Sequence, residues 1–155
     1  MSQQLKAAGV DLIFGLKGLK VHSKICLIER IENNKKRLYG FISTGNFNET
    51  TARVYSDFTL FTSNQKILKE VSKVFDFLQF SYKMHDYRHL IVSPHHTANK
   101  LFELIDNEIY NAKKGIYSEI ILKLNSFTSY KFVDKLYEAS QQGVKIKLLI
   151  RGICC

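Results

Sequence analysis

The sequence predicts an α/β protein with two consecutive parts, residues 1–84 and 85–155. We expect a mixed sheet in the first part and a mainly parallel β-α-β-α-β arrangement in the second. Strand-like runs dominate the first part, whereas helical and strand-like runs alternate in the second. A basic, aromatic stretch, SYKMHDYRH, lies near their boundary. Strands that alternate with helices favour a parallel sheet with right-handed crossovers.

In the first part, a short helix is predicted at residues 2–8, with Gly9 as its C-terminal cap. Apolar runs between polar segments predict four strands. These strands lie at residues 10–16, 19–31, 37–44 and 57–62. The polar turn ENNKK between the second and third strands predicts a hairpin. Apolar residues at helical spacing, such as Leu68 and Val71, predict a helix over residues 64–80.

In the second part, apolar periodicity predicts three strands and two helices in alternation. The strands lie at residues 89–93, 118–126 and 144–150. The helices lie at residues 98–115 and 130–143. Pro94 ends the first of these strands, and a glycine closes each helix.

Composition limits the partners that the protein can have. Of the 155 residues, 45% are apolar, which is enough for a hydrophobic core. The net charge of +9 favours polyanions as binding partners. No apolar run approaches the ~20 residues that a membrane span needs. The cysteines are Cys26, Cys154 and Cys155, an odd number with two adjacent, which argues against a disulfide framework and for a reduced, cytoplasmic protein.

Both ends of the chain lack the signals of a complete domain. SQQLKAAG has the character of the last turns of a helix, and VKIKLLIRGICC stops in or just after an apolar strand. We therefore expect a piece of a longer protein.

A histidine and a lysine lie two residues apart in the strand-like run KVHSKICLIERI. Because strand side chains alternate between faces, His22 and Lys24 should share one face. An ammonium disfavours protonation of a neighbouring imidazole, a neutral imidazole is a nucleophile, and an ammonium can bind the charge of a phosphoryl group in transfer. The pair therefore suits attack on phosphorus, with an unrelated surface histidine and lysine as the alternative.

A polar loop, STGNFNETTARVYSD, follows the next strand. Its glycine permits close approach of the backbone, and the amide of Asn46 can donate to phosphate oxygens. Arg53 offers a bidentate phosphate contact, and Tyr55 can stack on a base. The alternative is an ordinary loop that leads into a short helix capped by Asn48 or Thr50.

Polar side chains also gather at the end of a strand in the second part. Lys123, Asn125 and Ser126 lie where ligands collect in open α/β sheets, so we interpret them as phosphate contacts. The adjacent histidines of SPHHTANK lack cysteine or acidic partners at ligand spacing, so we expect no metal site in this chain. His85 and His89 lie in the basic linker and should be solvated.

The segments GLKVHSK, STGNFNETTARVYSD, KLNS and LIRGICC resemble, in order and spacing, the large, histidine-phosphorylating type of polyphosphate kinase. STGNFNETTARVYSD and RGICC are the specific segments, whereas H-x-K alone is not. The resemblance covers nearly the whole chain and implies the middle of that family's C-terminal catalytic half. It further implies the end of one phospholipase-D-like domain in residues 1–84 and the start of another in residues 85–155.

The resemblance implies roles for individual residues. His22 matches the histidine that ATP phosphorylates, and Lys24 matches the lysine beside it. Asn46 lies at the amide position that follows H-x-K in the wider phospholipase-D-like superfamily. Tyr55 matches a tyrosine that contacts the nucleotide, and Arg151 matches an arginine that contacts its phosphates.

The implied activity is the reversible transfer of the terminal phosphate of ATP to polyphosphate, with ADP as the other product and Mg²⁺ as cofactor. In that family, the arginines that bind magnesium and phosphate come before the segment that matches this chain. The second catalytic histidine comes after that segment. We therefore expect little or no turnover from the isolated chain. For the full-length protein we expect a homo-oligomer, no nucleic-acid partner, and a cytoplasmic location that could include the membrane surface.

Two other functions stay open. A phospholipase-D-like phosphodiesterase or nuclease needs a second H-x-K, which a homodimer could supply. The aspartate that phospholipases carry after H-x-K is absent, and Glu29 lies near that place on the opposite strand face from His22. A non-enzymatic basic module would expose aromatic residues among its lysines and arginines, whereas Phe58, Phe75 and Phe102 fall at predicted core positions.

Overall fold

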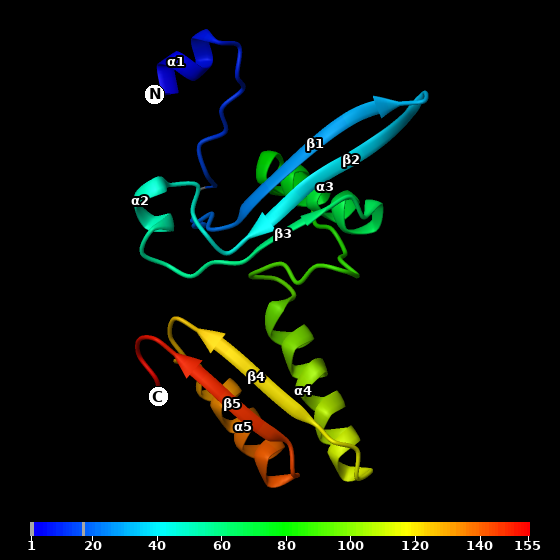
Figure 1. The fold of residues 1–155 in the computed structure, drawn as a ribbon, viewed down its shortest axis with the longest axis vertical. Coiled ribbons are helices and arrows are strands. Elements are labelled where there is room, and N and C mark those ends of the chain that lie inside the picture. Colours follow the sequence, from blue (N-terminus) through cyan, green and yellow to red (C-terminus); the bar gives the residue numbers. More distant parts are fainter. Residues whose placement is uncertain (1, 17) are drawn as a thin grey trace. The chain divides into compact units, whose positions relative to one another are not determined.

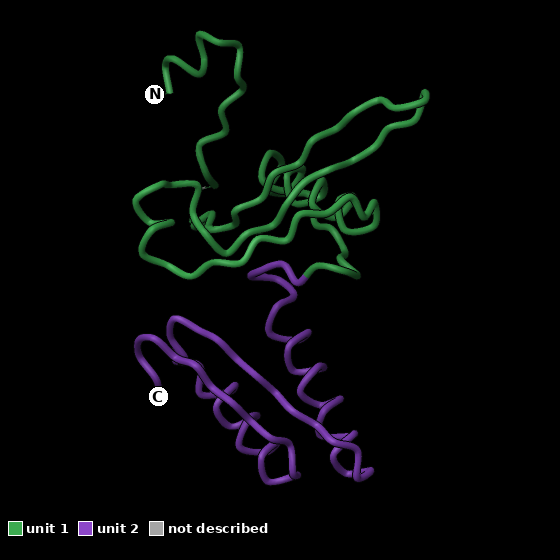
Figure 2. The backbone as a smooth tube through the Cα atoms, viewed as in Figure 1, with its two compact units in different colours: residues 1–90 green, residues 91–155 purple. Residues whose placement is uncertain are grey.

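The computed structural model describes residues 2–16 and 18–155. Met1 and Lys17, which belong to the predicted first domain, lie outside the described residues. The chain forms two compact units, Met1–Leu90 and Ile91–Cys155, and each is described by itself (Figure 2). The elements of the first unit are α1 (Ser2–Ala7), β1 (Lys24–Glu32), β2 (Lys35–Ser43), α2 (Glu49–Ala52), β3 (Thr59–Thr62) and α3 (Gln65–Gln79). Those of the second unit are α4 (Thr97–Lys113), β4 (Glu119–Leu124), α5 (Tyr130–Gln141) and β5 (Lys145–Ile150).

The first unit is built on a three-stranded sheet in the order β1-β2-β3. The predicted hairpin is confirmed: Glu32 pairs with Lys35, and the two residues between them have positive φ, 50° at Asn33 and 58° at Asn34. Two-residue hairpin turns require such φ values, and asparagine adopts them readily. β2 pairs with β3 only from Gly40 to Ser43, so the β1–β2 hairpin extends past the end of β3 (Figure 1).

One face of this sheet packs against α3. Leu68 and Val71 of α3 are fully buried, and they meet Leu38 of β2 together with half-buried side chains of β1 and β2. The side chain of Gln65 continues the ladder where β3 has ended. Its amide nitrogen donates to the carbonyl of Leu38 at 2.9 Å, and its oxygen accepts from the amide of Leu38 at 3.1 Å. The register of the hairpin is thus tied to the start of α3.

A buried carboxylate on α3 holds the segment that follows the helix. Glu70 is 6% exposed, and its two oxygens accept the backbone amides of Arg88, His89 and Leu90, each at 2.9 Å. Burial alone would raise the pKa of Glu70, but these three hydrogen bonds outweigh it and hold the pKa below its ordinary value. Residues 88–90 are therefore fixed to the first unit.

The second unit pairs β4 with β5 in parallel, from Glu119–Lys145 to Leu124–Ile150. Ile105 and Ile109 of α4 and Leu136 and Ala139 of α5 pack into one core against this sheet. Phe102 and Phe132 stack between the two helices, with ring centroids 4.4 Å apart. Parallel strands need a crossover, and α5 supplies it between β4 and β5.

Lys135 ties the two helices of the second unit together. Its ammonium lies 2.5 Å from Asp106 of α4 and 2.8 Å from Glu138 of its own helix. Hydrogen bonds to Asp106 and then Glu138 raise the pKa of Lys135 above its ordinary value. The ion pairs therefore reinforce the contact that the apolar core makes.

The predicted α/β class is confirmed, with differences in detail. The sheet of the first unit, expected to be mixed, is antiparallel in every described pairing: a tight turn joins β1 to β2, and the loop that holds α2 returns the chain to β3. The strand expected at residues 10–16 forms only an isolated bridge between Leu16 and Leu19, since no described neighbour offers it a ladder. The strand expected at residues 89–93 is absent: Glu70 takes the amides of His89 and Leu90, and residues 91–93 join neither of the described sheets.

Two aromatic residues expected in the core are exposed. Phe58 precedes β3 and is 70% exposed, and Phe75 lies on the outer side of α3 and is 40% exposed. Phe102 does pack against the core of the second unit. Within the described part of the chain, no helix combines the length and the apolar character needed to cross a bilayer.

The pH dependence of stability tests the role of Glu70. Because its folded-state pKa lies below the ordinary value of 4.5, its stabilisation is complete above that pH and is lost as the pH falls through the folded-state pKa. Glu70→Gln should lower the free energy of unfolding by about 1–3 kcal/mol at pH 7. Urea unfolding should show a smaller difference between variant and parent at pH 3. Equal differences at the two pH values would contradict this role.

Candidate functional site

The predicted histidine–lysine pair lies at the open end of the β1–β2 hairpin. β1 begins at Lys24, which pairs with Ser43, so His22 lies just before the strand rather than inside it. The Lys24 ammonium is 2.9 Å from Nδ1 and 3.3 Å from Nε2 of His22, and it donates to the carbonyl of His22 at 2.6 Å. The structure therefore brings the two side chains together, as expected, although His22 lies before β1 and the alternation of strand side chains does not extend to it.

This contact has a chemical consequence. A lysine ammonium has donors and no acceptor, so it can hydrogen-bond only to the ring nitrogen that carries no proton, and the tautomer decides which of the two nitrogens that is. The contact is thus compatible with a neutral imidazole, the form that can act as a nucleophile. The side chain of His22 is exposed, so a phosphate compound can reach the ring.

The polar loop after β2 begins beside this pair. Because Lys24 is opposite Ser43 in the antiparallel ladder, residues before Lys24 and residues after Ser43 leave the sheet at the same end. The hydroxyl of Ser43 lies 2.8 Å from that of Thr59 and accepts the amide of Gly45 at 3.0 Å. The loop is therefore fixed to both β2 and β3 where it passes the end of the hairpin.

The loop continues into a short helix, as the alternative interpretation of the sequence expected. The side chain of Asn48 caps α2 by accepting the amide of Thr51 at 3.0 Å. Asn46 is exposed, and its carbonyl accepts the amide of Asn48 at 2.8 Å. Because Asn48 supplies the cap of α2, the side-chain amide of Asn46, which we expect to contact phosphate, is not used for capping.

Two further predicted residues follow α2. Arg53 forms an ion pair with Glu49, one helical turn earlier, and both side chains are largely exposed. A phosphate would have to compete with that carboxylate for the guanidinium. Tyr55 is 49% exposed, so part of its ring is accessible.

Asp57 and Thr59, which close the loop from the β3 side, are not among the residues that the sequence predicted for the site. The hydroxyl of Thr44 donates to the Asp57 carboxylate at 3.2 Å and accepts the amide of Phe58 at 3.0 Å. The only signal was their place in ARVYSDFT, directly after the residues to which roles were given.

In the second unit, the backbones of three predicted residues lie close together at the carboxyl ends of β4 and β5. The amide of Arg151 donates to Leu124 at 3.1 Å, and the amide of Gly152 donates to Asn125 at 2.7 Å. A Cβ atom at position 152 would lie 2.8 Å from the Asn125 carbonyl and 3.2 Å from the Ser126 hydroxyl. Glycine is thus needed here for close approach, and Asn125, Ser126 and Arg151 meet at one edge of the sheet.

Lys123 lies elsewhere on the same strand. Leu122 and Leu124 face the core, so the alternation of side chains puts Lys123 on the other face of the sheet. That face also holds Glu119, whose carboxylate is 2.7 Å from the Lys147 ammonium. The hydrogen bond from Lys147 holds the pKa of Glu119 below its ordinary value. Lys123 therefore contributes positive charge to an exposed face and is not part of the cluster at the strand ends.

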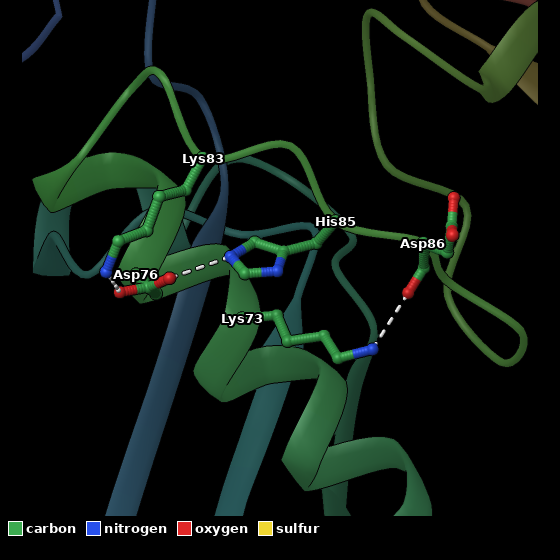
Figure 3. Close-up of polar contacts among 5 residues, drawn as sticks. All are labelled: Lys73, Asp76, Lys83, His85 and Asp86. Carbon is green, nitrogen blue, oxygen red and sulfur yellow. Dashed lines mark hydrogen bonds and ion pairs between the residues drawn. The ribbon is translucent and has the colours of Figure 1, made fainter.

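A separate polar cluster holds the linker after α3 (Figure 3). Asp76 accepts from the Lys83 ammonium at 3.0 Å and lies 2.8 Å from Nε2 of His85. The hydrogen bond from Lys83, with a second from His85, holds the pKa of Asp76 below its ordinary value. Lys73 donates to the carbonyl of Asp86 at 2.9 Å. His85, expected to be solvated, is instead mostly covered and paired, so this cluster has a structural role.

Among residues 2–16 and 18–155, no group of three or more histidine, cysteine, aspartate or glutamate side chains could hold a metal ion.

Two family models match the chain, and both describe domains of a kinase. Polyphosphate kinase C-terminal domain 1 matches residues 1–85, and polyphosphate kinase C-terminal domain 2 matches residues 90–155. The chain belongs to the polyphosphate kinase family.

Individual relatives agree with this assignment. The polyphosphate kinase of Yersinia pestis is 46% identical over 153 residues, which are 99% of this chain and 22% of that protein. That of Escherichia coli (strain K12) is 45% identical with the same coverage. The crystal structure of polyphosphate kinase from Porphyromonas gingivalis matches with a TM-score of 0.87 and 36% identity, over 99% of this chain and 26% of that chain. This chain thus spans only 22% of the length of the first two relatives.

The close approach at Gly152 gives a prediction for the second unit. Gly152→Ala should force the Arg151 loop away from Asn125 and lower the free energy of unfolding by about 1–3 kcal/mol, as overpacking does. Urea unfolding measures the change, and Cys155→Ala, at an exposed position of the same tail, is the matched control. If the two variants were equally stable, the close approach would not constrain the loop.

Proposed function

We propose that this chain carries the phosphate-accepting histidine of a polyphosphate kinase, which transfers the terminal phosphate of ATP to polyphosphate. The observation that carries the proposal is the Lys24 ammonium 2.9 Å from Nδ1 of an exposed His22, at the sheet end where the Gly45–Asn46 loop begins. Membership of the polyphosphate kinase family supports the choice of substrates.

The proposed transfer has two steps. A ring nitrogen of His22 attacks the γ-phosphorus of ATP; the N–P bond forms, the bond to the β–γ bridging oxygen breaks, and ADP leaves with that electron pair. A terminal oxygen of polyphosphate then attacks the same phosphorus, the N–P bond breaks, and the chain is one phosphate longer. Each step is reversible because it exchanges one phosphoryl bond for another.

In the first unit, the side chains around His22 offset the charge of the phosphoryl group. Lys24 places a cation beside the ring, and such charge stabilisation is the main term in phosphoryl transfer. Asn46 donates from the loop, Arg53 exchanges its pairing with Glu49 for the phosphate, and Tyr55 contacts the nucleotide. Both Asn46 and Arg53 are exposed and able to make these contacts.

In the second unit, we propose that the strand ends bind phosphates. Arg151 supplies the guanidinium, while Asn125 and Ser126 supply an amide and a hydroxyl at the same edge of the parallel sheet. Lys123 adds charge on the neighbouring face. The net charge of +9 suits a polyanionic substrate.

Several features of the whole protein stay proposals. Mg²⁺ is expected from the resemblance, but the described residues do not form a cluster for it, and we assign it no step. We propose a homo-oligomeric, cytoplasmic protein that could contact the membrane surface. Since this chain spans 22% of its relatives' length, we expect the isolated chain to accept phosphate once with little or no turnover.

Labelling with radioactive ATP tests the proposal. Incubation of the chain with γ-labelled ATP and Mg²⁺ should give an acid-labile, base-stable phosphate on His22, because a phosphoramidate hydrolyses in acid. His22→Gln should remove the label, and His89→Gln, at an exposed histidine of the linker, should keep it. Cleavage of DNA or lipid without label would instead indicate a phosphodiesterase, and salt-sensitive DNA binding with neither activity would indicate a binding module.

A further inference from the structure

We propose that Asp57 is a positioning residue, which holds the Thr44–Asn46 loop in the geometry that phosphate transfer to His22 requires. The inference rests on the proposed function and adds a residue to it. Asp57 is assigned no contact with ATP or polyphosphate; its effect passes through Thr44 and Gly45.

The side chain of Asp57 fills the space beside Gly45. A Cβ atom at this position would lie 2.6 Å from Oδ2, 2.7 Å from Cγ and 2.8 Å from Cβ of Asp57. Gly45 does not have the positive φ of Gly9 or Gly115, so its backbone conformation does not require glycine. Glycine is required at residue 45 because the side chain of Asp57 fills the space that a side chain there would occupy.

Hydrogen bonds fix Asp57 in this place. The Thr44 hydroxyl donates to Oδ1 of Asp57 at 3.2 Å, and its oxygen accepts the amide of Phe58 at 3.0 Å. The amide of Thr44 in turn donates to the carbonyl of Phe58 at 3.0 Å. Residues 44 and 57–58 are thus joined through both backbone and side chain, one step beyond the last ladder pair, Ser43–Thr59.

The Asp57 carboxylate interacts within the loop itself. Within the described ranges of the chain, Asp57 is not a member of any ion pair within 4.0 Å, so its resolved partner is the Thr44 hydroxyl. An asparagine would keep both the shape and the accepting oxygen, whereas an alanine would keep neither. The two substitutions therefore separate positioning by shape and hydrogen bonding from an effect of charge.

The path of the loop affects the surroundings of His22, because the Lys24–Ser43 pair joins the two segments. Lys24 is fixed opposite Ser43, so the path of residues 44–46 decides where the Asn46 amide lies relative to the imidazole. Misplacement of a reacting group by about 1 Å can cost on the order of 100-fold in rate. Asp57 should therefore affect the rate of transfer more than the amount of nucleotide bound.

The test compares Asp57→Ala, Asp57→Asn, Gly45→Ala and the double variant Gly45→Ala/Asp57→Ala in this chain. Two quantities are measured: the rate of His22 labelling against ATP concentration, and amide hydrogen exchange at Gly45 and Asn46 without ligand. Asp57→Ala and Gly45→Ala should each slow labelling at saturating ATP by about 10- to 100-fold. Half-saturation should change little, and Asp57→Asn should recover most of the rate.

Each outcome decides the inference. Exchange at Gly45 should rise in Asp57→Ala, and the double variant should label no more slowly than the slower single variant, since both changes break one contact. Normal labelling and normal exchange in Asp57→Ala would overturn the inference. So would multiplying effects in the double variant. If the parent chain takes no label, the proposed function fails, while the exchange at Gly45 still decides whether Asp57 holds the loop.

Discussion

The antiparallel pairing of Lys24 with Ser43 is the constraint on which the candidate site depends. In this register, the segment that ends in His22 and the loop that begins at Thr44 leave the sheet at the same end. The turn at Asn33–Asn34 sets the register from one side, and the amide of Gln65 sets it from the other by bonding to both polar groups of Leu38. A slip of one residue would send Lys24 to the face that packs on α3.

The two units position their polar residues by different means. In the first unit, an antiparallel ladder ends and hydroxyl groups extend it, with Ser43 meeting Thr59 across the last pair. In the second, the parallel strands continue as backbone bonds from Arg151 and Gly152 to Leu124 and Asn125. Both arrangements need a glycine for space: Gly45 leaves room for the side chain of Asp57, and Gly152 leaves room for the backbone carbonyl of Asn125.

Much of the fold could be predicted because its determinants are local. The helix α3 follows from apolar spacing, and the hairpin follows from a turn that asparagine favours. The strand expected at residues 89–93 failed for a reason that no local pattern contains: Glu70, about twenty residues earlier, takes the amides of that segment. Its apolar composition is typical of a strand, but the Glu70 carboxylate accepts the two amides at its start.

The candidate site shows the same division. The proximity of His22 and Lys24 could be predicted from their spacing of two residues, although the strand begins only at Lys24. The contact of Arg53 with Glu49 and that of Asp57 with Gly45 could not, since the first needs the exact bounds of α2 and the second needs the path of the loop between β2 and β3. Specific motifs indicated the chemistry, whereas the side chains that hold the motif in place became visible only in three dimensions.

A titration of the chain with tripolyphosphate, followed through backbone amide chemical shifts, tests most directly whether this sheet end is the phosphate site. The account predicts that the signals of His22, Lys24, Gly45 and Asn46 move together and fit one dissociation constant. Shifts confined to the basic hairpin tip at residues 35–37, with Gly45 and Asn46 unmoved, would contradict it.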